Sequence, residues 1–151
     1  MKILVDADSC PHRAREIIMR CALRLNIKAI FAANRSIPGI SGRGITMELC
    51  GPGEGAADQR LIELAAAGDL AVSRDIPLAE KLLNLNVTVI NDRGREYNSE
   101  NIREMLSLRN FAVDLADKGL GTERHSVYGK KETKNFADSL DRLVRKLEVR
   151  N

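Results

Sequence analysis

Short apolar runs alternate with segments of helical periodicity from residue 2 to residue 91, and this alternation limits the possible folds more than any other feature. The strand candidates are residues 2–6, 27–33, 45–50, 69–73 and 86–91, and the helix candidates are 12–25, 56–67 and 76–84. Strands that alternate with helices pair in parallel and bury both faces of their sheet under the helices. The sequence therefore predicts an α/β protein with a mostly parallel sheet.

The last third of the chain has a different character. Helical spacing returns at about 99–117 and 131–148, with a predicted loop at 118–130. A length of 151 residues suits a single domain, 1–151. Residues 118–151 carry 9 Lys/Arg and 5 Asp/Glu, a net of +4 against +3 for the whole chain. This basic segment can supply phosphate contacts, although a solvated helix face explains the same pattern.

Composition excludes several classes of protein. Aromatic residues make up 3% of the chain and there is no Trp, which argues against base stacking on aromatic platforms. No apolar run approaches the roughly 18 residues of a membrane span, so no membrane association is expected. The cysteines do not form a CxxC pair, which favours a reducing, cytoplasmic location over a disulfide framework. A homodimer is compatible with this composition.

Acidic and amide side chains follow the predicted strands, where the carboxyl ends of parallel strands share one edge of a sheet. The set comprises Asp6, Asp8, Asp75, Asn91 and Asp92, together with Asp58 in the first turn of the helix at 56–67. Oxygen ligands without His or Cys suit a hard divalent ion. We therefore expect Mg²⁺ or Mn²⁺ at this edge, where such an ion stabilises charge on a phosphoryl oxygen.

Each acid also has a structural interpretation. Asp58 favours a helix N-terminus, and Asp75 is placed to cap the helix that follows it. Asp6 and Asp8 are harder to explain in this way, because two carboxylates directly after a strand repel each other unless a cation, a proton or donors intervene. Asp69 begins its strand at the opposite end of the sheet, so it is left out of the set.

Other residues near the same edge have both a functional and a structural interpretation. Asn34 and Ser36 follow the second strand and Arg93 follows the fifth, and with Asn91 they are candidates for binding a substrate phosphate. An ordinary solvated turn explains them equally well. Cys10 precedes a helix N-terminus, a setting that can activate a thiol, but a buried thiol is the favoured interpretation.

Several motifs resemble the YaiI/YqxD family of small, largely uncharacterised bacterial proteins. The resemblance rests on VDADSCP at 5–11, AANRS at 32–36, AAD at 56–58, GDLAVSRDIPLA at 68–79, NDRGREY at 91–97 and IREMLSLRNF at 102–111. These motifs cover most of the chain. The chain departs from the family at 121–136, which reads GTERHSVYGKKETKNF in place of a Gly-Gly-Pro segment.

The resemblance implies a Rossmann-like, three-layer α/β/α domain similar to PIN and NYN nuclease domains. In those folds acids at the strand ends hold Mg²⁺ or Mn²⁺ for phosphodiester hydrolysis. Asp6, Asp58 and Asp75 match these acids by position, Asn91 or Asp92 would complete the metal shell, and Asp8 is an additional acid. The resemblance thus implies metal at Asp6, Asp58, Asp75 and Asp92, with Asp8 joining the catalytic acids.

Three functions follow as hypotheses. The first is a metal-dependent nuclease or related phosphodiesterase, with RNA as the expected substrate. The second is a non-catalytic module on a nuclease-like scaffold that binds RNA or protein. The third and weakest is a phosphatase in which Asp6 is the nucleophile and Asp8 the acid/base of a DxD motif.

Overall fold

The computed structural model describes residues 1–119 and 127–150, and in this part of the chain six strands form one sheet. The strands are β1 (Lys2–Asp6), β2 (Lys28–Ala33), β3 (Ile45–Leu49), β4 (Leu70–Val72), β5 (Thr88–Ile90) and β6 (Glu96–Tyr97). Their order across the sheet is β3-β2-β1-β4-β5-β6. Strands β1 to β5 pair in parallel and β6 pairs antiparallel with β5. The predicted mostly parallel sheet is confirmed.

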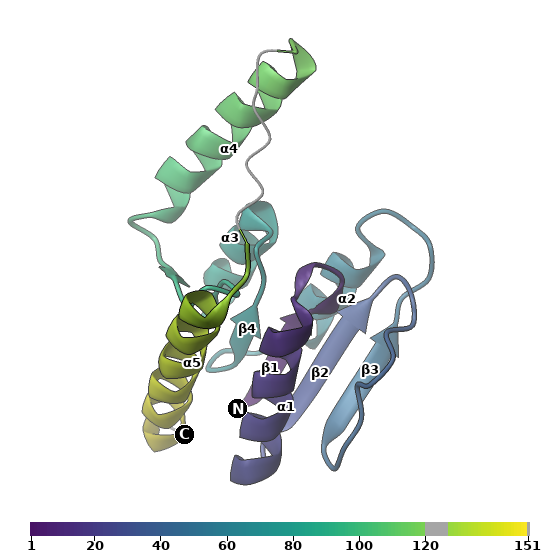
Figure 1. Cartoon of the computed structure of the whole chain (residues 1–151). Coiled ribbons are helices and arrows are strands. Elements are labelled where there is room, and N and C mark those ends of the chain that lie inside the picture. Colours follow the sequence, from purple (N-terminus) through teal and green to yellow (C-terminus); the bar gives the residue numbers. More distant parts are fainter. Residues whose placement is uncertain (120–126, 151) are drawn as a thin grey trace.

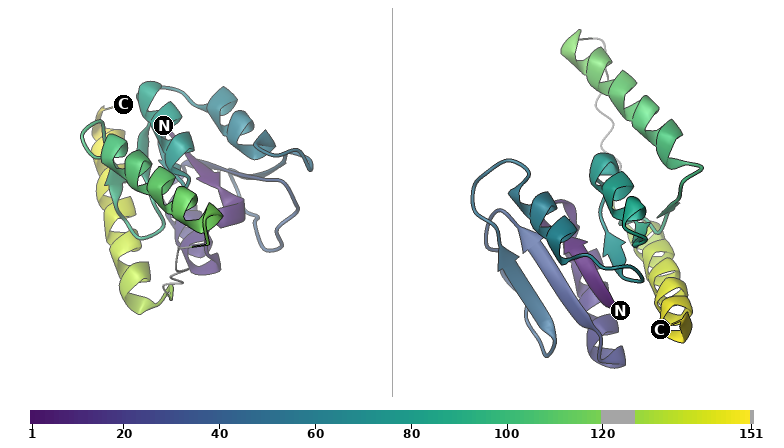
Figure 2. Two further views of the ribbon diagram at one scale, coloured as in Figure 1. Left: turned by 90° about the horizontal axis from the view of Figure 1, so that it is seen from above. Right: turned by 180° about the vertical axis from the view of Figure 1, so that it is seen from behind.

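Helices cover both faces of this sheet (Figures 1 and 2). They are α1 (His12–Leu25), α2 (Ala56–Leu64), α3 (Ile76–Asn84), α4 (Ile102–Asp117) and α5 (Lys130–Arg150), with a 3₁₀ turn, η1 (Ala7–Ser9), after β1. Because side chains alternate along a strand, Ile3 and Val5 pack under α1 and α5, while Leu4 packs under α2 and α3. The structure is therefore a three-layer, Rossmann-like α/β fold.

The connection from β2 to β3 contains no helix. The segment 34–44 joins these parallel neighbours, and its Ile37 and Ile40 pack against the core on the α1 face. The loop thus covers part of the face that a crossover helix would otherwise bury. At the carboxyl ends of β1 and β2 the chain therefore continues directly into η1 and into the start of this loop.

Helix α4 leads away from the sheet after its first turn (Figures 1 and 2). Ile102 is its only buried residue, whereas Leu108 and Phe111 are 61% and 62% exposed. The base of α4 packs against α3. Only this base therefore contributes to the body of the protein. Neither α4 nor any other helix of the described residues is long and apolar enough to cross a membrane.

Apart from small shifts at the ends of several elements, the structure differs from the sequence prediction at β6 and at the end of α2. Strand β6 was not predicted, because a two-residue strand has no periodicity to detect. The helix predicted at 56–67 ends at Leu64, and Gly68 follows in a left-handed turn with φ +89°. Part of the predicted loop at 118–130 and of the altered segment at 121–136 lies outside the described residues.

Candidate functional site

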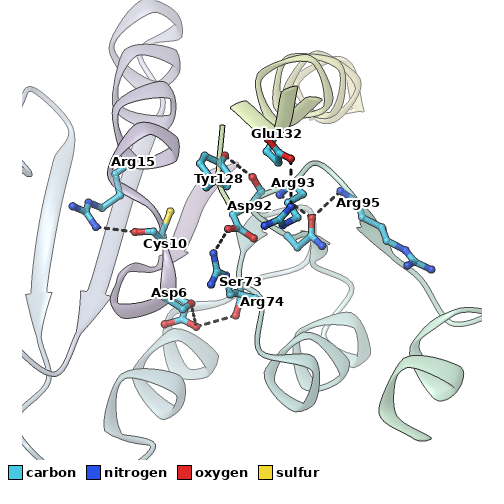
Figure 3. A network of polar contacts seen from close by, with 12 residues as sticks. Asp6, Cys10, Arg15, Ser73, Arg74, Asp92, Arg93, Arg95, Tyr128 and Glu132 are labelled. Carbon is cyan, nitrogen blue, oxygen red and sulfur yellow. Dashed lines mark hydrogen bonds and ion pairs between the residues drawn. The ribbon is translucent and has the colours of Figure 1, made fainter. Parts of the chain in front are cut away.

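Asp6 lies at the topological switch point of the sheet, between β1 and β4. The chain leaves β1 towards β2 on one side and returns to β4 on the other, an arrangement that opens a crevice at the carboxyl ends of the strands. Asp6 is buried, with 7% of its surface exposed. Its Oδ2 accepts hydrogen bonds from Ser73 Oγ at 2.9 Å and Ser9 Oγ at 3.1 Å (Figure 3). In the described residues no hydrogen bond engages its Oδ1.

Burial raises the pKa of the Asp6 carboxyl above its ordinary value. The two serine hydroxyls act in the opposite direction because they stabilise the carboxylate. The charges of Asp75 and Asp8 raise the pKa further. Asp8 and Asp75, two of the acids predicted at this edge, therefore lie within electrostatic reach of Asp6.

Asp75 caps helix α3, as its position in the sequence predicts. Its Oδ1 accepts from the backbone N–H of Leu78 at 3.0 Å, and its own N–H donates to Ser73 Oγ at 3.0 Å. Ser73 therefore links Asp6 and Asp75 through one hydroxyl. The structural interpretation of Asp75 is correct, and it does not conflict with a functional one, because the capping bond uses only Oδ1.

Asp58, in the first turn of α2, lies against Asp75. The pKa of Asp58 is raised to about 6, first by burial, then by the charges of Asp75 and Asp6, and by a hydrogen bond with the Asp75 side chain. Two carboxyl groups in contact favour a shared proton or a bound cation. The structure thus places Asp58 beside Asp6 and Asp75, although α2 is not attached to the end of either strand.

Asp8 is exposed on η1. Its Oδ2 accepts from the backbone N–H of Asn34 at 2.8 Å, which ties η1 to the start of the loop after β2. The side chain of Asn34 and the neighbouring Ser36 are exposed. Asn34 therefore lies beside the acids through its backbone, and a role for either residue in substrate binding stays a prediction.

The chemistry of this donor set is suited to a hard divalent cation. The charge of Asp75 raises the pKa of both Asp6 and Asp58, and Asp58 and Asp75 are in contact. Even so, within residues 1–119 and 127–150 no three His, Cys, Asp or Glu side chains are close enough to form a complete metal site. Mg²⁺ commonly binds through one or two carboxylates, with waters and substrate phosphates as its other ligands. The residues fit such an open site and do not fit a closed protein cage.

Asp92 makes a different contact from the one predicted. It is buried, its carboxylate forms an ion pair with Arg74, and its backbone carbonyl accepts from the Tyr128 hydroxyl at 2.6 Å (Figure 3). The predicted place of Asp92 among metal ligands therefore stays a prediction. Arg74 lies between Ser73 and Asp75 in the chain, so it connects the acids to the region around Asp92.

Asn91 and Arg93 build the turn between β5 and β6. The Oδ1 atom of Asn91 accepts from the backbone N–H groups of Arg93 at 3.0 Å and Arg95 at 2.9 Å. The guanidinium of Arg93 lies 3.7 Å from Glu132 at the start of α5. Asn91 thus acts through the backbone of the turn, which is the solvated-turn interpretation of this residue.

Sequence reasoning missed Ser73, Arg74 and Arg109. Arg109, on α4, lines the same cavity as Arg74 and Asp92. Ser73 and Arg74 stand in the SRD segment directly before Asp75, so their position at the end of β4 was an available signal. No signal along the chain connects Arg109 with this edge, because α4 reaches it only through its packing against α3. The contact between Asp92 and Arg74 likewise joins two different strand ends.

Two residues left outside the predicted site have structural roles. Cys10 is buried, and burial together with the charges of Asp92 and Asp6 raises its pKa to about 12. The buried-thiol interpretation therefore fits better than a nucleophile. At the other end of the sheet Asp69 accepts from the backbone N–H of Lys2 at 3.0 Å and from its Nζ at 2.6 Å. This explains why an acid begins β4.

The fold and these acids define a Rossmann-like α/β protein with a carboxylate cluster at its switch point. The model of the uncharacterized YaiI/YqxD family matches residues 4–146, and the chain belongs to this family. A UPF0178 protein of Treponema pallidum (strain Nichols) is 48% identical over 97% of this chain and 83% of its own. A UPF0178 protein of Treponema denticola is 46% identical over 97% of this chain and 93% of its own. No solved structure matches significantly.

Proposed function

We propose that this protein is a divalent-metal-dependent phosphodiesterase that cleaves RNA, with a PIN-like active site. The observation that carries the proposal is the contact between Asp58 and Asp75 beside the buried Asp6 at the switch point. Such a cluster is unfavourable without a counter-charge near neutral pH. A divalent cation, followed by the phosphate it attracts, would supply that charge.

Each acid has a distinct part in the proposed site. Among Asp6, Asp58 and Asp75, one or two carboxylates would bind Mg²⁺ or Mn²⁺ directly and the others through its waters. The bound ion supplies a Lewis acid for a phosphoryl oxygen. The bonds from Ser9 and Ser73 orient Asp6 and leave its Oδ1 for a ligand. Asp8 is exposed on η1 and would orient the attacking water or act as a further ligand. No covalent intermediate is required.

Cleavage of labelled single-stranded RNA in the presence of Mn²⁺ or Mg²⁺ tests this proposal. Asp58→Asn and Asp75→Asn keep the size of each side chain, and the second keeps an acceptor for the cap of α3. We expect each variant to lose cleavage by about 10²-fold or more. Asp114→Asn, an exposed position on α4, serves as the matched control and should retain full activity.

A direct binding measurement separates the metal site from turnover. Titration with Mn²⁺, followed by calorimetry or by its electron spin resonance signal, should show one site in the wild type and in Asp114→Asn. Asp58→Asn and Asp75→Asn should bind Mn²⁺ at least about tenfold more weakly. Wild-type protein that neither binds Mn²⁺ nor cleaves RNA contradicts the proposal.

The non-catalytic binding module is the second candidate. The observation in its favour is that no three metal-ligating side chains of the described residues form a ready-made cluster. This candidate predicts RNA binding that survives Asp58→Asn, without cleavage and without affinity for Mn²⁺. The phosphatase hypothesis has less support, because Asp6 is buried and already accepts two hydroxyl hydrogen bonds.

A further inference from the structure

A cavity of about 600 Å³ lies at the carboxyl edge of the sheet, between the β5–β6 turn and the base of α4. This volume is in the range of small-molecule sites, about 300–1,000 Å³. Arginines at four positions line it, namely 74, 93, 95 and 109. Three of them come from the ends of strands and one from α4, so the fold rather than one basic segment brings them together.

The positive charge of this arginine pocket is only partly balanced. Arg74 forms an ion pair with Asp92, and Arg93 lies 3.7 Å from Glu132. Arg95 and Arg109 are exposed and form no ion pair with a described carboxylate. In Figure 3 the side chain of Arg95 extends away from Asp92. Exposed guanidinium groups without a carboxylate partner are suited to bidentate contacts with phosphate.

Beside Asn91 and Asp92, part of the remaining wall of the pocket is apolar. Ile76 and Met105 are half-buried in it, and Leu108 is 61% exposed. A site for phosphate alone has no need for such a wall, because inorganic phosphate has no apolar surface to cover. The pocket therefore suits a ligand with one phosphate and one flat, weakly polar part, which the arginines and the aliphatic side chains can contact on its faces.

We propose that this arginine pocket binds one nucleoside phosphate unit of a nucleic-acid strand, with the phosphate at Arg95 and Arg109 and the base against Met105 and Leu108. The inference rests on the proposed function for its direction, because Arg74 connects the pocket with Ser73 and Asp75 at the acid cluster. A nucleotide held here would place the next phosphate of its strand towards those acids. The pocket is thus a substrate-positioning site next to the proposed cleavage site.

Calorimetric titration with adenosine 5′-monophosphate in the presence of EDTA tests the pocket without loading a metal. We expect saturable binding at one site, with inorganic phosphate and adenosine each binding at least about tenfold more weakly. The double variant Arg95→Gln/Arg109→Gln should weaken binding of the nucleotide by about tenfold or more. Both arginines are exposed, so these changes should leave the fold intact.

Two further variants locate the two halves of the ligand. Arg103→Gln removes a charge from the same helix at an exposed position that does not line this pocket, and it should bind the nucleotide like the wild type. Leu108→Ser should weaken binding of the nucleotide but not of inorganic phosphate. Equal losses in Arg103→Gln and the double variant, or equal affinity for phosphate and nucleotide, would overturn the inference.

The proposed function and the pocket fail separately. RNA cleavage that depends on Asp58, in a protein that does not bind the nucleotide, overturns the pocket and leaves the phosphodiesterase. Nucleotide binding that depends on Arg95 and Arg109, in a protein that neither binds Mn²⁺ nor cleaves RNA, supports the pocket and overturns the phosphodiesterase. The Asp58→Asn variant should still bind the nucleotide in EDTA, because Asp58 does not line the pocket.

Discussion

The Asp58 carboxyl both favours the N-terminus of α2 and has a raised pKa. It occupies the first turn of α2, where a negative charge is favourable, yet burial and the charges of Asp75 and Asp6 raise its pKa to about 6. Near neutral pH the carboxyl is therefore mostly ionised against its neighbours. A bound cation would relieve this repulsion, so stability, pH and metal binding are linked at one residue.

Asp58→Asn should stabilise the protein at about pH 7.5 and have little effect near pH 4. The folded-state pKa lies above the ordinary 3.8, so the folded state holds its proton more tightly and the free energy of unfolding falls as pH rises from about 4 to 6. Asp58→Asn has no carboxyl to ionise at this position, so its free energy of unfolding does not fall for this reason. We expect a gain of about 1 kcal/mol, because water screens a half-buried carboxyl.

Urea unfolding of both proteins at the two pH values measures this difference. Asp114→Asn is the control, since that carboxylate is exposed and its removal should change neither value. Added Mn²⁺ should stabilise the wild type more at about pH 7.5 than at pH 5, and should stabilise Asp58→Asn less. A gain that is the same at both pH values would show that Asp58 is not held near its neighbours' charges.

The β5–β6 turn is the element that positions the arginine pocket. Asn91 holds the backbone of Arg93 and Arg95 through its Oδ1. Gly94, between them, adopts φ +86° and packs so closely on α5 that an added Cβ would lie 2.5 Å from the carbonyl oxygen of Asn135. Only glycine combines this conformation with this approach. The turn is therefore clamped between β5 and the start of α5.

Gly94→Ala should be far more destabilising than Gly39→Ala. Both glycines have positive φ, +86° and +87°, but a Cβ at Gly39 would meet nothing within 4 Å. The left-handed conformation alone costs about 1 kcal/mol, which is the loss expected for Gly39→Ala. The collision with α5 should add about 2 kcal/mol or more in Gly94→Ala. Thermal or urea unfolding distinguishes the two, and equal losses would contradict the clamp.

Charge is divided unevenly over the whole molecule. Residues 118–151 carry a net of +4, which leaves −1 for residues 1–117. Much of the charge of α5 is balanced in place, since Lys134 lies 2.9 Å from Asp138 and Arg145 lies 3.2 Å from Asp141. The unbalanced guanidinium groups of Arg95 and Arg109 instead line the same cavity as Arg74 and Asp92. The basic region that would guide a polyanion is therefore at the carboxyl edge of the sheet as well as on the C-terminal helix.

Binding of single-stranded RNA should weaken as salt rises, and part of this dependence should come from the arginine pocket. Each neutralised phosphate contributes a slope of about −0.7 to the logarithm of the association constant against the logarithm of salt concentration. Because both arginines contact the same phosphate, Arg95→Gln/Arg109→Gln should reduce the magnitude of the slope by about 0.7. Fluorescence anisotropy at several salt concentrations measures it. Arg103→Gln should keep the wild-type slope, and a slope unchanged in the double variant would place RNA elsewhere.

The layers of the fold and part of the site can be derived from the amino-acid sequence alone. Alternating strands and helices allowed little besides a parallel sheet covered on both faces, because each apolar run must be buried. Parallel strands end at a common edge, so Asp6 and Asp75 could be placed together from their positions after β1 and β4. The capping role of Asp75 also followed from its place before a helix that contains Pro at its start.

The contacts between side chains of the site, in contrast, depend on how the elements pack in three dimensions. The orientation of α2 brought Asp58 against Asp75, and the turn of residues 51–55 leaves that orientation open in the sequence. Arg74 pairs with Asp92, and α4 brings Arg109 into the same cavity as the arginines of the strand ends. These contacts join segments far apart in the chain, so they depend on how helices pack on the sheet and have no local pattern. Periodicity determines which face of an element is buried, whereas long-range packing determines the neighbours of its charged groups.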